Sequence, residues 1–212
     1  MSTRRRLVVL DVDSTFIADE QIDLLAAHAG VGEQVANITE RAMAGELDFA
    51  AALRERVAAL AGLEASVLAL VGAQVRLSPG AAELIAGLQE RRWPVGLVSG
   101  GFHEIVDLLA AEHGITRVQA NRLMVDDDGR LSGQVHPPIV DRAAKEVFLR
   151  EFAAHEDIDM ARTVAVGDGA NDLDMVLAAG VGVGFRPKAA LAEAADVVLT
   201  GRLDDLLPIL DR

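Results

Sequence analysis

The chain has 212 residues, a length that suits one α/β core with a modest insertion, and 51% of its residues are apolar. The formal charge of −13 argues against the basic surface that nucleic-acid binding needs, and the absence of cysteine excludes disulfides, thiolate catalysis and cysteine-ligated zinc. The apolar run at residues 7–10 is too short for a signal peptide, and no run reaches the length of a membrane span. We therefore expect a cytoplasmic protein that binds neither nucleic acid nor membrane.

Short apolar runs rich in β-branched residues predict five buried parallel strands, at residues 7–10, 95–98, 163–166, 181–183 and 197–199. Helical patterns separate most of them, at residues 102–113, 141–154 and 171–179, with one more beginning at Ser78-Pro79. Gly180 is expected to end the helix at 171–179 in the C′ position that favours glycine. This alternation predicts an α/β fold in which helices cover both faces of a parallel sheet.

The segment at residues 19–75 breaks the alternation, because its apolar residues recur at helical spacing and no strand pattern is present. Three glycines fall where turns are needed, at Gly30, Gly45 and Gly62. We expect three or four helices that form a small cap at residues 17–75, inserted after the first strand of a core made of residues 1–16 and 76–212. Residues 123–135, with an Asp-Gly turn signal at Asp128-Gly129, predict a hairpin.

Polar side chains follow the predicted strands. Asp11 and Asp13 come directly after the first strand, and Ser99-Gly100-Gly101 follows the second. Open parallel sheets bind ligands at the carboxyl ends of their strands. The serine hydroxyl and the free backbone N–H groups of the glycine turn could hold an anion, although such a turn is also ordinary between a strand and a helix.

Lys145 falls in the first turn of a predicted helix, where the helix dipole disfavours a cation, and it is one of only two lysines in the chain. A solvated surface lysine is the simpler explanation of that residue alone. Gly167-Asp168-Gly169-Ala170-Asn171-Asp172 is harder to explain as a structural loop, because three oxygen-bearing side chains lie within five residues. Carboxylate oxygens are the ligands that Mg²⁺ prefers in proteins.

Together these segments resemble the haloacid dehalogenase superfamily of phosphohydrolases, over residues 8–200. Within it the chain most closely resembles the phosphoserine phosphatase family. The cap is the most specific part of that resemblance, because the core motifs are shared across the superfamily. The segments that carry it are Asp11-Val-Asp-Ser-Thr15 with Glu20, Met43-Ala-Gly-Glu-Leu-Asp-Phe49, Leu53-Arg-Glu-Arg56-Val57, Val98-Ser-Gly-Gly-Phe102 and Gly167-Asp-Gly-Ala-Asn-Asp172.

The resemblance implies Mg²⁺-dependent hydrolysis of phosphoserine to serine and phosphate, the last step of serine biosynthesis, through an aspartyl-phosphate intermediate. Asp11 would be the nucleophile, and Asp13 the general acid and then the general base. The Asp11 carboxylate, the Asp13 carbonyl and the Asp168 carboxylate would bind the metal. The resemblance further implies that Ser99, Gly100 and Lys145 contact the phosphoryl oxygens and that Asn171 and Asp172 orient the site, with Asp172 paired to Lys145.

The predicted cap would select the substrate. By the resemblance, Glu20 suits the ammonium of phosphoserine and Arg56 its carboxylate, since a guanidinium matches a carboxylate bidentately. Phe49, Leu53 and Arg56 share one helix face at i, i+4 and i+7. Without the resemblance, Phe49 and Met43 would be assigned to the core; with it, they are expected to shield the site from water.

Three alternatives stay open. The chain could act on another small phospho-amino compound such as phosphohomoserine or phosphoethanolamine, as a phosphatase or phosphotransferase. A dehalogenase is disfavoured, because that chemistry does not require the acid supplied by Asp13. A silent magnesium or phospho-ligand binding module is disfavoured, because every catalytic position of the pattern is filled. The sequence leaves open whether the chain is a monomer or a homodimer.

Overall fold

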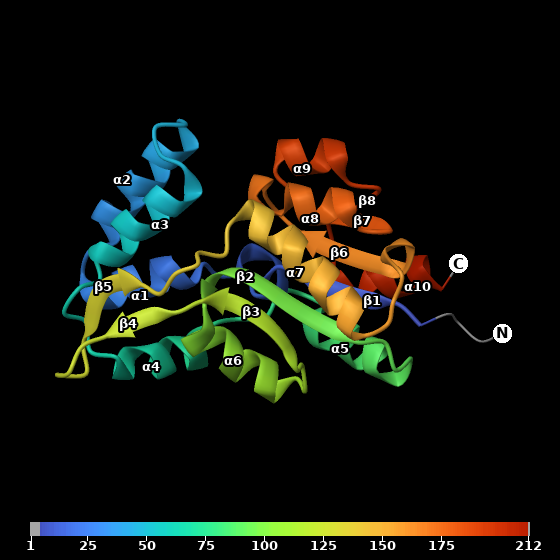
Figure 1. The fold of residues 1–212 in the computed structure, drawn as a ribbon, viewed down its shortest axis with the longest axis horizontal. Coiled ribbons are helices and arrows are strands. Elements are labelled where there is room, and N and C mark those ends of the chain that lie inside the picture. The colour runs from blue at the N-terminus through green and yellow to red at the C-terminus, as the bar shows by residue number, and fades with distance from the viewer. Residues whose placement is uncertain (1–4, 212) are drawn as a thin grey trace.

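A computed structural model describes residues 5–211 and contains a six-stranded parallel sheet in the order β3-β2-β1-β6-β7-β8 (Figure 1). All five predicted strands are present, and the expected α/β class is confirmed. The strands are β1 (Leu7–Leu10), β2 (Val95–Phe102), β3 (Arg117–Asn121), β6 (Thr163–Gly167), β7 (Val181–Phe185) and β8 (Val197–Leu199). Strand β3 was not predicted, since its sequence is polar and three of its five residues are only half-buried.

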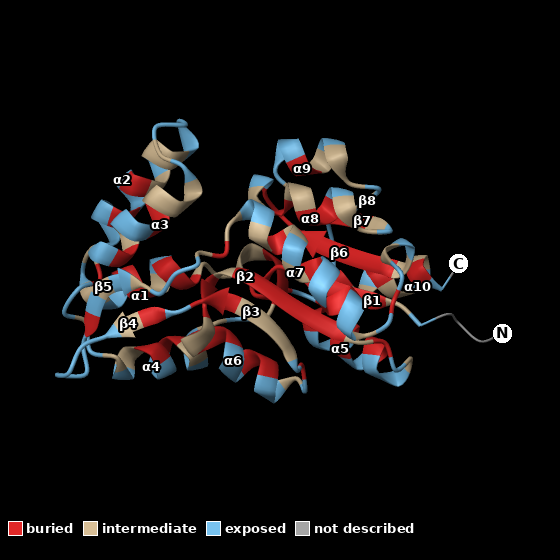
Figure 2. Ribbon diagram, in the orientation of Figure 1, coloured by how far each residue is buried: buried red, intermediate tan, exposed pale blue. Residues whose placement is uncertain are grey.

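Successive side chains of β1 point to opposite faces of the sheet, and each face is covered by its own set of helices. Val8 and Leu10 pack in the same apolar cluster as residues of α5 (Ala81–Glu90), α6 (His103–Glu112) and α10 (Leu207–Leu210). Leu7 and Val9 pack with residues of α7 (Arg142–His155), α8 (Leu173–Ala178) and α9 (Ala189–Ala194). Figure 2 shows the result, buried strands at the centre and helices exposed on their outer sides.

Four helices, separated by short turns, follow β1 in the segment predicted to be helical: α1 (Gln21–Ala29), α2 (Gly32–Met43), α3 (Phe49–Ala58) and α4 (Ser66–Gln74). The three predicted turn glycines have positive φ, 71° at Gly30, 80° at Gly45 and 85° at Gly62, a conformation that glycine adopts at no steric cost. The predicted hairpin is present as β4 (Leu123–Val125) and β5 (Leu131–Val135), which pair antiparallel.

The hairpin packs against the helical segment rather than against the sheet. The Gly62 N–H donates to the Leu131 carbonyl over 2.8 Å, and the Leu131 N–H donates back to Leu63 over 2.8 Å. In Figure 1 both units lie on the same side of the sheet. The division of the chain into a cap at 17–75 and a core stays a prediction, and residues 1–4 and 212 of that core lie outside the described residues.

Two details of the predicted helix ends are wrong. Helix α5 begins at Ala81, two residues after Pro79, because Gly80 has a φ of 85° and interrupts the helical backbone. Gly180 does not have the positive φ of a left-handed cap. A Cβ atom there would lie 2.3 Å from the Ala161 carbonyl oxygen, so close backbone approach, not left-handed conformation, requires glycine at this position.

Candidate active site

The buried centre of the site is a lysine between two aspartates. Asp11 follows β1, and Asp172 follows β6. Lys145, the fourth residue of α7, reaches both, its Nζ donating over 2.6 Å to each carboxylate. Burial alone would lower the pKa of Lys145, but the charges of Asp11 and Asp172 outweigh it and raise that pKa. Lys145 is therefore a buried cation bound to Asp11, and the interpretation of Lys145 as a solvated surface lysine is wrong.

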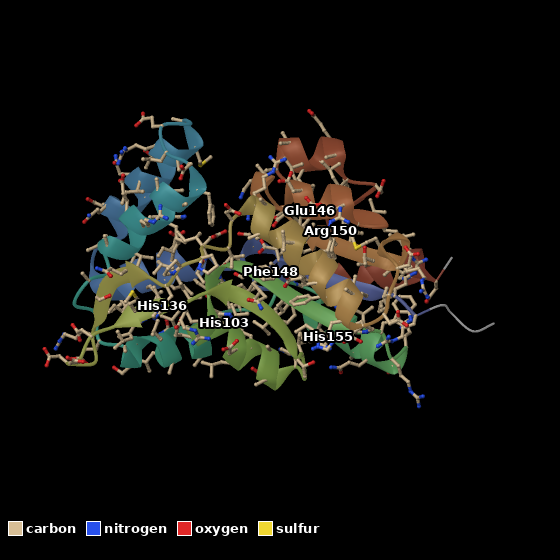
Figure 3. All side chains as sticks on the ribbon, in the orientation of Figure 1. His103, His136, Glu146, Phe148, Arg150 and His155 are labelled. Carbon is tan, nitrogen blue, oxygen red and sulfur yellow. The ribbon has the colours of Figure 1, made fainter. Side chains whose placement is uncertain are left out.

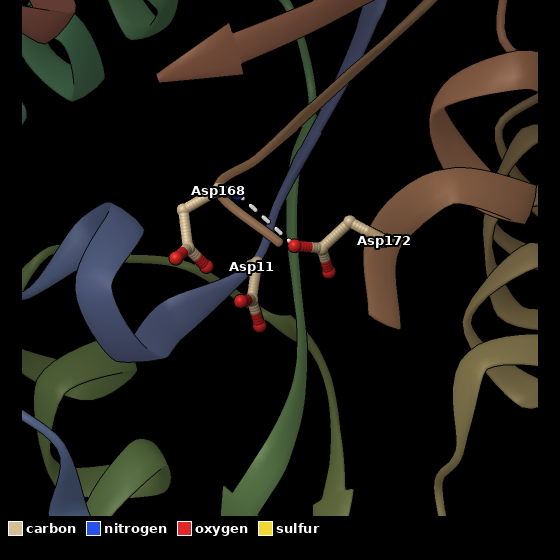
Figure 4. Close-up of side chains that lie close together, drawn as sticks. All are labelled: Asp11, Asp168 and Asp172. Carbon is tan, nitrogen blue, oxygen red and sulfur yellow. Dashed lines mark hydrogen bonds between the residues drawn. The ribbon is translucent and has the colours of Figure 1, made fainter. Parts of the chain in front are cut away.

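Asp172 is fully occupied by hydrogen-bond donors of the chain itself. One carboxylate oxygen accepts from Lys145, and the other accepts from the backbone N–H groups of Asp168 and Gly169, each over 3.1 Å. Figure 4 shows the bond to Asp168 and the carboxylates of Asp11 and Asp168 on the same side of the loop. Asp172 thus shapes the Gly167–Asp172 loop, and Asp11 and Asp168 remain as the carboxylates available to a ligand.

The donor set fits a hard divalent cation. Carboxylate oxygens of Asp11, Asp168 and Asp172 lie within 4.8 Å of one another, and all three residues are buried. Burial raises the pKa of Asp11 and also that of Asp168, so a cation would relieve the desolvation of both carboxylates. Among the described residues, no histidine belongs to this potential metal-binding group, so all its ligand atoms are carboxylate oxygens. Figure 3 shows His103 on α6, His155 on α7 and His136 after β5, in separate parts of the fold.

Asp13 is held by hydrogen bonds on both carboxylate oxygens. Gln21 donates to Oδ1 through its backbone N–H over 2.8 Å and to Oδ2 through its side-chain amide over 3.0 Å, and the Ser99 hydroxyl donates to Oδ2 over 3.1 Å. Burial raises the pKa of Asp13, and the bonds from Gln21 and Ser99 oppose that rise. Asp13 and Asp11 therefore differ in their hydrogen-bond partners, and Asp11 is buried whereas Asp13 is half-buried at the cavity wall.

A cavity of about 410 Å³ opens between the strand ends and the helices α1 to α3. Residues from both sides line it, and the predicted ones among them are Asp11, Asp13, Glu20, Met43, Phe49, Arg56, Gly100, Asp168 and Asn171. Three other predicted residues, Ser99, Lys145 and Asp172, are at most 1% exposed and lie behind this surface. The structure therefore brings all the predicted residues to one place, in two layers.

Glu20 and Arg56, two lining residues of opposite charge, are both partly buried. The Glu20 carboxylate accepts from the Ser14 hydroxyl over 2.6 Å, and burial, then the charge of Asp13, raises the pKa of Glu20 to about 7. Burial lowers the pKa of the Arg56 guanidinium, whose Nε donates to the Ala52 carbonyl over 3.3 Å. Among the described residues Arg56 forms no salt bridge, so its charge remains for an anionic ligand.

The two apolar lining residues differ in how far they shield the site. The ring of Phe49 lies over Gly100, where a Cβ atom would meet its Cζ at 2.8 Å, so the ring closes against the strand end. Met43 is 81% exposed at the end of α2 and covers little of the cavity here. Phe49 thus lies where a shielding residue is required, whereas the shielding role predicted for Met43 stays a prediction.

Comparison with known proteins places this geometry in a family. The model of the haloacid dehalogenase-like hydrolases matches residues 8–176. The chain belongs to this family. As a haloacid dehalogenase-like hydrolase it carries the buried Asp11 at the end of β1 and the Lys145–Asp172 pair beside it, and the superfamily predicted from the sequence is confirmed.

Similar hydrolases of this family are phosphoserine phosphatases. A Streptomyces coelicolor phosphoserine phosphatase is 52% identical over 98% of this chain and 49% of its own length, so the chain spans about half of it. A Streptococcus thermophilus phosphoserine phosphatase is 50% identical over 94% of this chain and 93% of its own. A solved phospho-aspartyl intermediate analogue of phosphoserine phosphatase superposes with a TM-score of 0.90 at 38% identity, over 97% of this chain and 98% of that one. The predicted resemblance to phosphoserine phosphatases is confirmed.

Lys188 and Gln21 each contact a carboxylate of this hydrolase site and were not predicted from the sequence. Lys188, which precedes α9, lines the cavity and places its Nζ 3.0 Å from Oδ2 of Asp168. Lys188 could have been predicted as a site residue, because it is one of only two lysines and follows a predicted strand. Gln21 could not have been predicted from the sequence, because a glutamine at the start of a helix is ordinary.

Proposed function

We propose that the chain hydrolyses the phosphate ester of phosphoserine, with Asp11 as the covalent nucleophile and a divalent metal, Mg²⁺, as the cofactor. The observation that carries this proposal is a buried aspartate held by Lys145 at the end of β1. It opens into a cavity whose wall offers Glu20 and Arg56, and Arg56 has no salt bridge to any residue that the structure describes. A cytoplasmic location is part of the proposal, and the described residues contain no helix long and apolar enough to cross a membrane.

The reaction would have two displacements, which divide one difficult hydrolysis into easier steps. In the first, an Asp11 oxygen attacks phosphorus, the bond from phosphorus to the serine oxygen breaks, and Asp13 gives its proton to that oxygen. In the second, water attacks phosphorus, Asp13 takes the water proton, and the Asp11–phosphorus bond breaks to release phosphate. Asp13 is two residues from Asp11 and lines the same cavity, as a proton-transfer group requires.

The carboxylates of Asp11 and Asp168 and the backbone carbonyl of Asp13 would hold the metal. When bound, it would neutralise the nucleophile and the phosphoryl charge. Mg²⁺ is proposed because it is bound by one or two carboxylates together with substrate phosphate. The anion-binding groups would have the roles that the resemblance implies: Ser99, Gly100 and Lys145 would contact phosphoryl oxygens, and Asn171 would orient them. Gly100 and Asn171 line the cavity, while Ser99 and Lys145 are buried behind its wall.

The two charged wall residues support an amino-acid substrate. Glu20 would accept the ammonium, and Arg56 would bind the carboxylate through its guanidinium. The Arg56 guanidinium is half-buried and has no ion-pair partner among the described residues, so a ligand carboxylate would gain binding free energy here. Phosphoethanolamine, which lacks that carboxylate, would leave Arg56 unpaired and is therefore disfavoured.

Phosphate release with Mg²⁺ across phosphoserine, phosphothreonine, phosphoethanolamine, phosphohomoserine and an aryl phosphate tests the proposal. We expect a preference for phosphoserine, no turnover in Asp11→Asn, and a rise of KM in Arg56→Ala of about 30-fold or more, from the cost of about 2 kcal/mol or more when one partner of a buried charge pair is removed. Preference for another compound would overturn the substrate, and Asp11-independent turnover would overturn the mechanism.

A further inference from the structure

Gln21 is the first residue of α1, and its side chain is 1% exposed next to the site. Its two N–H groups, one of the backbone and one of the side-chain amide, bind the two different oxygens of the Asp13 carboxylate, over 2.8 Å and 3.0 Å. A carboxylate at the end of a loop can rotate about two side-chain bonds. Donors on both oxygens from one residue fix both rotations at once.

The other end of the same amide fixes its orientation. The Phe102 N–H at the end of β2 donates to the Gln21 Oε1 over 3.0 Å. Because that contact requires an acceptor, the amide oxygen faces Phe102 and the NH₂ group faces Asp13. Gly101 leaves room for this arrangement, since a Cβ atom there would lie 2.5 Å from the Gln21 Nε2 and 2.7 Å from the Asp13 Oδ2. Gln21 thus links Asp13 to the backbone of the sheet.

We propose that Gln21 is a positioning residue that holds the Asp13 carboxyl where it can transfer a proton to the leaving oxygen. The inference rests on the proposed function, because it assumes that Asp13 is the acid. A proton-transfer group must lie within hydrogen-bond reach of the atom it serves, and Asp13 has no other side-chain donor than Gln21 and Ser99 among the described residues. A purely structural role would instead be limited to satisfying the buried Phe102 N–H.

The leaving group separates these two roles. Serine leaves as an alkoxide and needs a proton, whereas nitrophenolate leaves without one. Two variants are used, and both keep the backbone N–H donor to Asp13. Gln21→Glu keeps the length and the acceptor for Phe102, and Gln21→Met removes the side-chain donor and acceptor together. We expect both to slow the transfer of phosphate from phosphoserine to Asp11 by about 10- to 100-fold, a part of the 10²–10⁴ that general acid catalysis supplies. The pre-steady-state burst of nitrophenolate should change less than threefold.

A double-mutant comparison with Asp13→Asn supplies the second test. If Gln21 acts through Asp13, Gln21→Glu should cause no further loss of phosphoserine turnover once Asp13→Asn is present. Equal losses on both substrates, unchanged turnover of both, or losses that multiply in the double variant would overturn the proposal. If circular dichroism shows that Gln21→Met does not fold, the result for Gln21→Glu alone decides between the positioning role and the structural role. Wild-type preference for another alkyl phosphate would count against the proposed substrate only, and that ester would then replace phosphoserine here.

Discussion

At the scale of single residues, the charged form of Glu20 lowers the stability of the fold, because partial burial removes its carboxylate from water. Its pKa is about 7 in the folded chain, against an ordinary value of 4.5, and burial is the main cause. Between these two pH values the folded chain binds more protons than the unfolded chain. Stability contributed by this group is therefore present at low pH and is lost as the pH rises from 4.5 to about 7.

We predict that Glu20→Gln stabilises the metal-free, substrate-free protein above neutral pH. The amide keeps the size and the acceptor for Ser14 but carries no charge to desolvate. The gain in the free energy of unfolding has an upper bound of about 3 kcal/mol, at 1.36 kcal/mol per pKa unit. Urea unfolding at several pH values measures it, with the exposed Glu193→Gln as control. Equal stability of Glu20→Gln and wild type above pH 7 would contradict the prediction.

Lys188 is the other residue whose charge affects the site directly. Its ammonium is paired with Asp168, a carboxylate proposed to hold the metal. We predict that Lys188→Gln tightens Mg²⁺ binding by up to about fivefold, because a partly exposed pair is worth about 1 kcal/mol at most. Isothermal titration calorimetry without substrate measures the dissociation constant. Arg202→Gln is the control, because Arg202 is exposed and does not line the cavity. Weaker binding in Lys188→Gln would show that Lys188 supports the metal rather than competing with it.

At the scale of elements, small residues mark the places where two segments meet. Gly180 joins α8 to β7 and lies against the carbonyl of Ala161, whereas Gly32 at the start of α2 has open space around its Cα. We predict that Gly180→Ala lowers the free energy of unfolding by about 1–3 kcal/mol, because backbone must move to admit the methyl group. Gly32→Ala should instead stabilise by about 0.5–1 kcal/mol. Thermal unfolding of both variants checks the contrast, and similar shifts in both would refute it.

How far the elements could be predicted depends on burial. The central strands are apolar on both faces, so their β-branched runs were readable, while β3 at the sheet edge alternates and was missed. The acidic and glycine-rich segments after β1 and β6 placed the site, because the ends of parallel strands meet at one edge. Gln21 was not predicted, and Phe49 was predicted as a shielding residue without its contact to Gly100. Only the packing of the helical segment on the sheet creates these contacts.

At the scale of the whole molecule, the site connects segments that are distant in the chain. Asp11 and Asp172 follow different strands, and Lys145 on α7 donates a hydrogen bond to both. A cation that binds the folded chain and not the unfolded chain must therefore stabilise the entire fold. The expected gain is about 2.7 kcal/mol at a concentration one hundred times the dissociation constant.

We predict that Mg²⁺ raises the melting temperature of the wild type and that Asp168→Asn abolishes most of this shift. The variant removes one charged ligand, so the linkage between cation binding and folding weakens. Differential scanning calorimetry with and without Mg²⁺ measures the shift, and Asp127→Asn in the exposed hairpin turn should keep it. A full Mg²⁺-dependent shift in Asp168→Asn would place the cation elsewhere.

The most direct test of the central claim is to trap the covalent intermediate. The wild type is mixed with phosphoserine and Mg²⁺, quenched in acid within one turnover, digested and analysed by mass spectrometry. We predict one phosphoryl group on the peptide that contains Asp11, and none on the same peptide of Asp11→Asn. Phosphate released from phosphoserine with no phosphoryl group on Asp11 at any quench time would contradict the account.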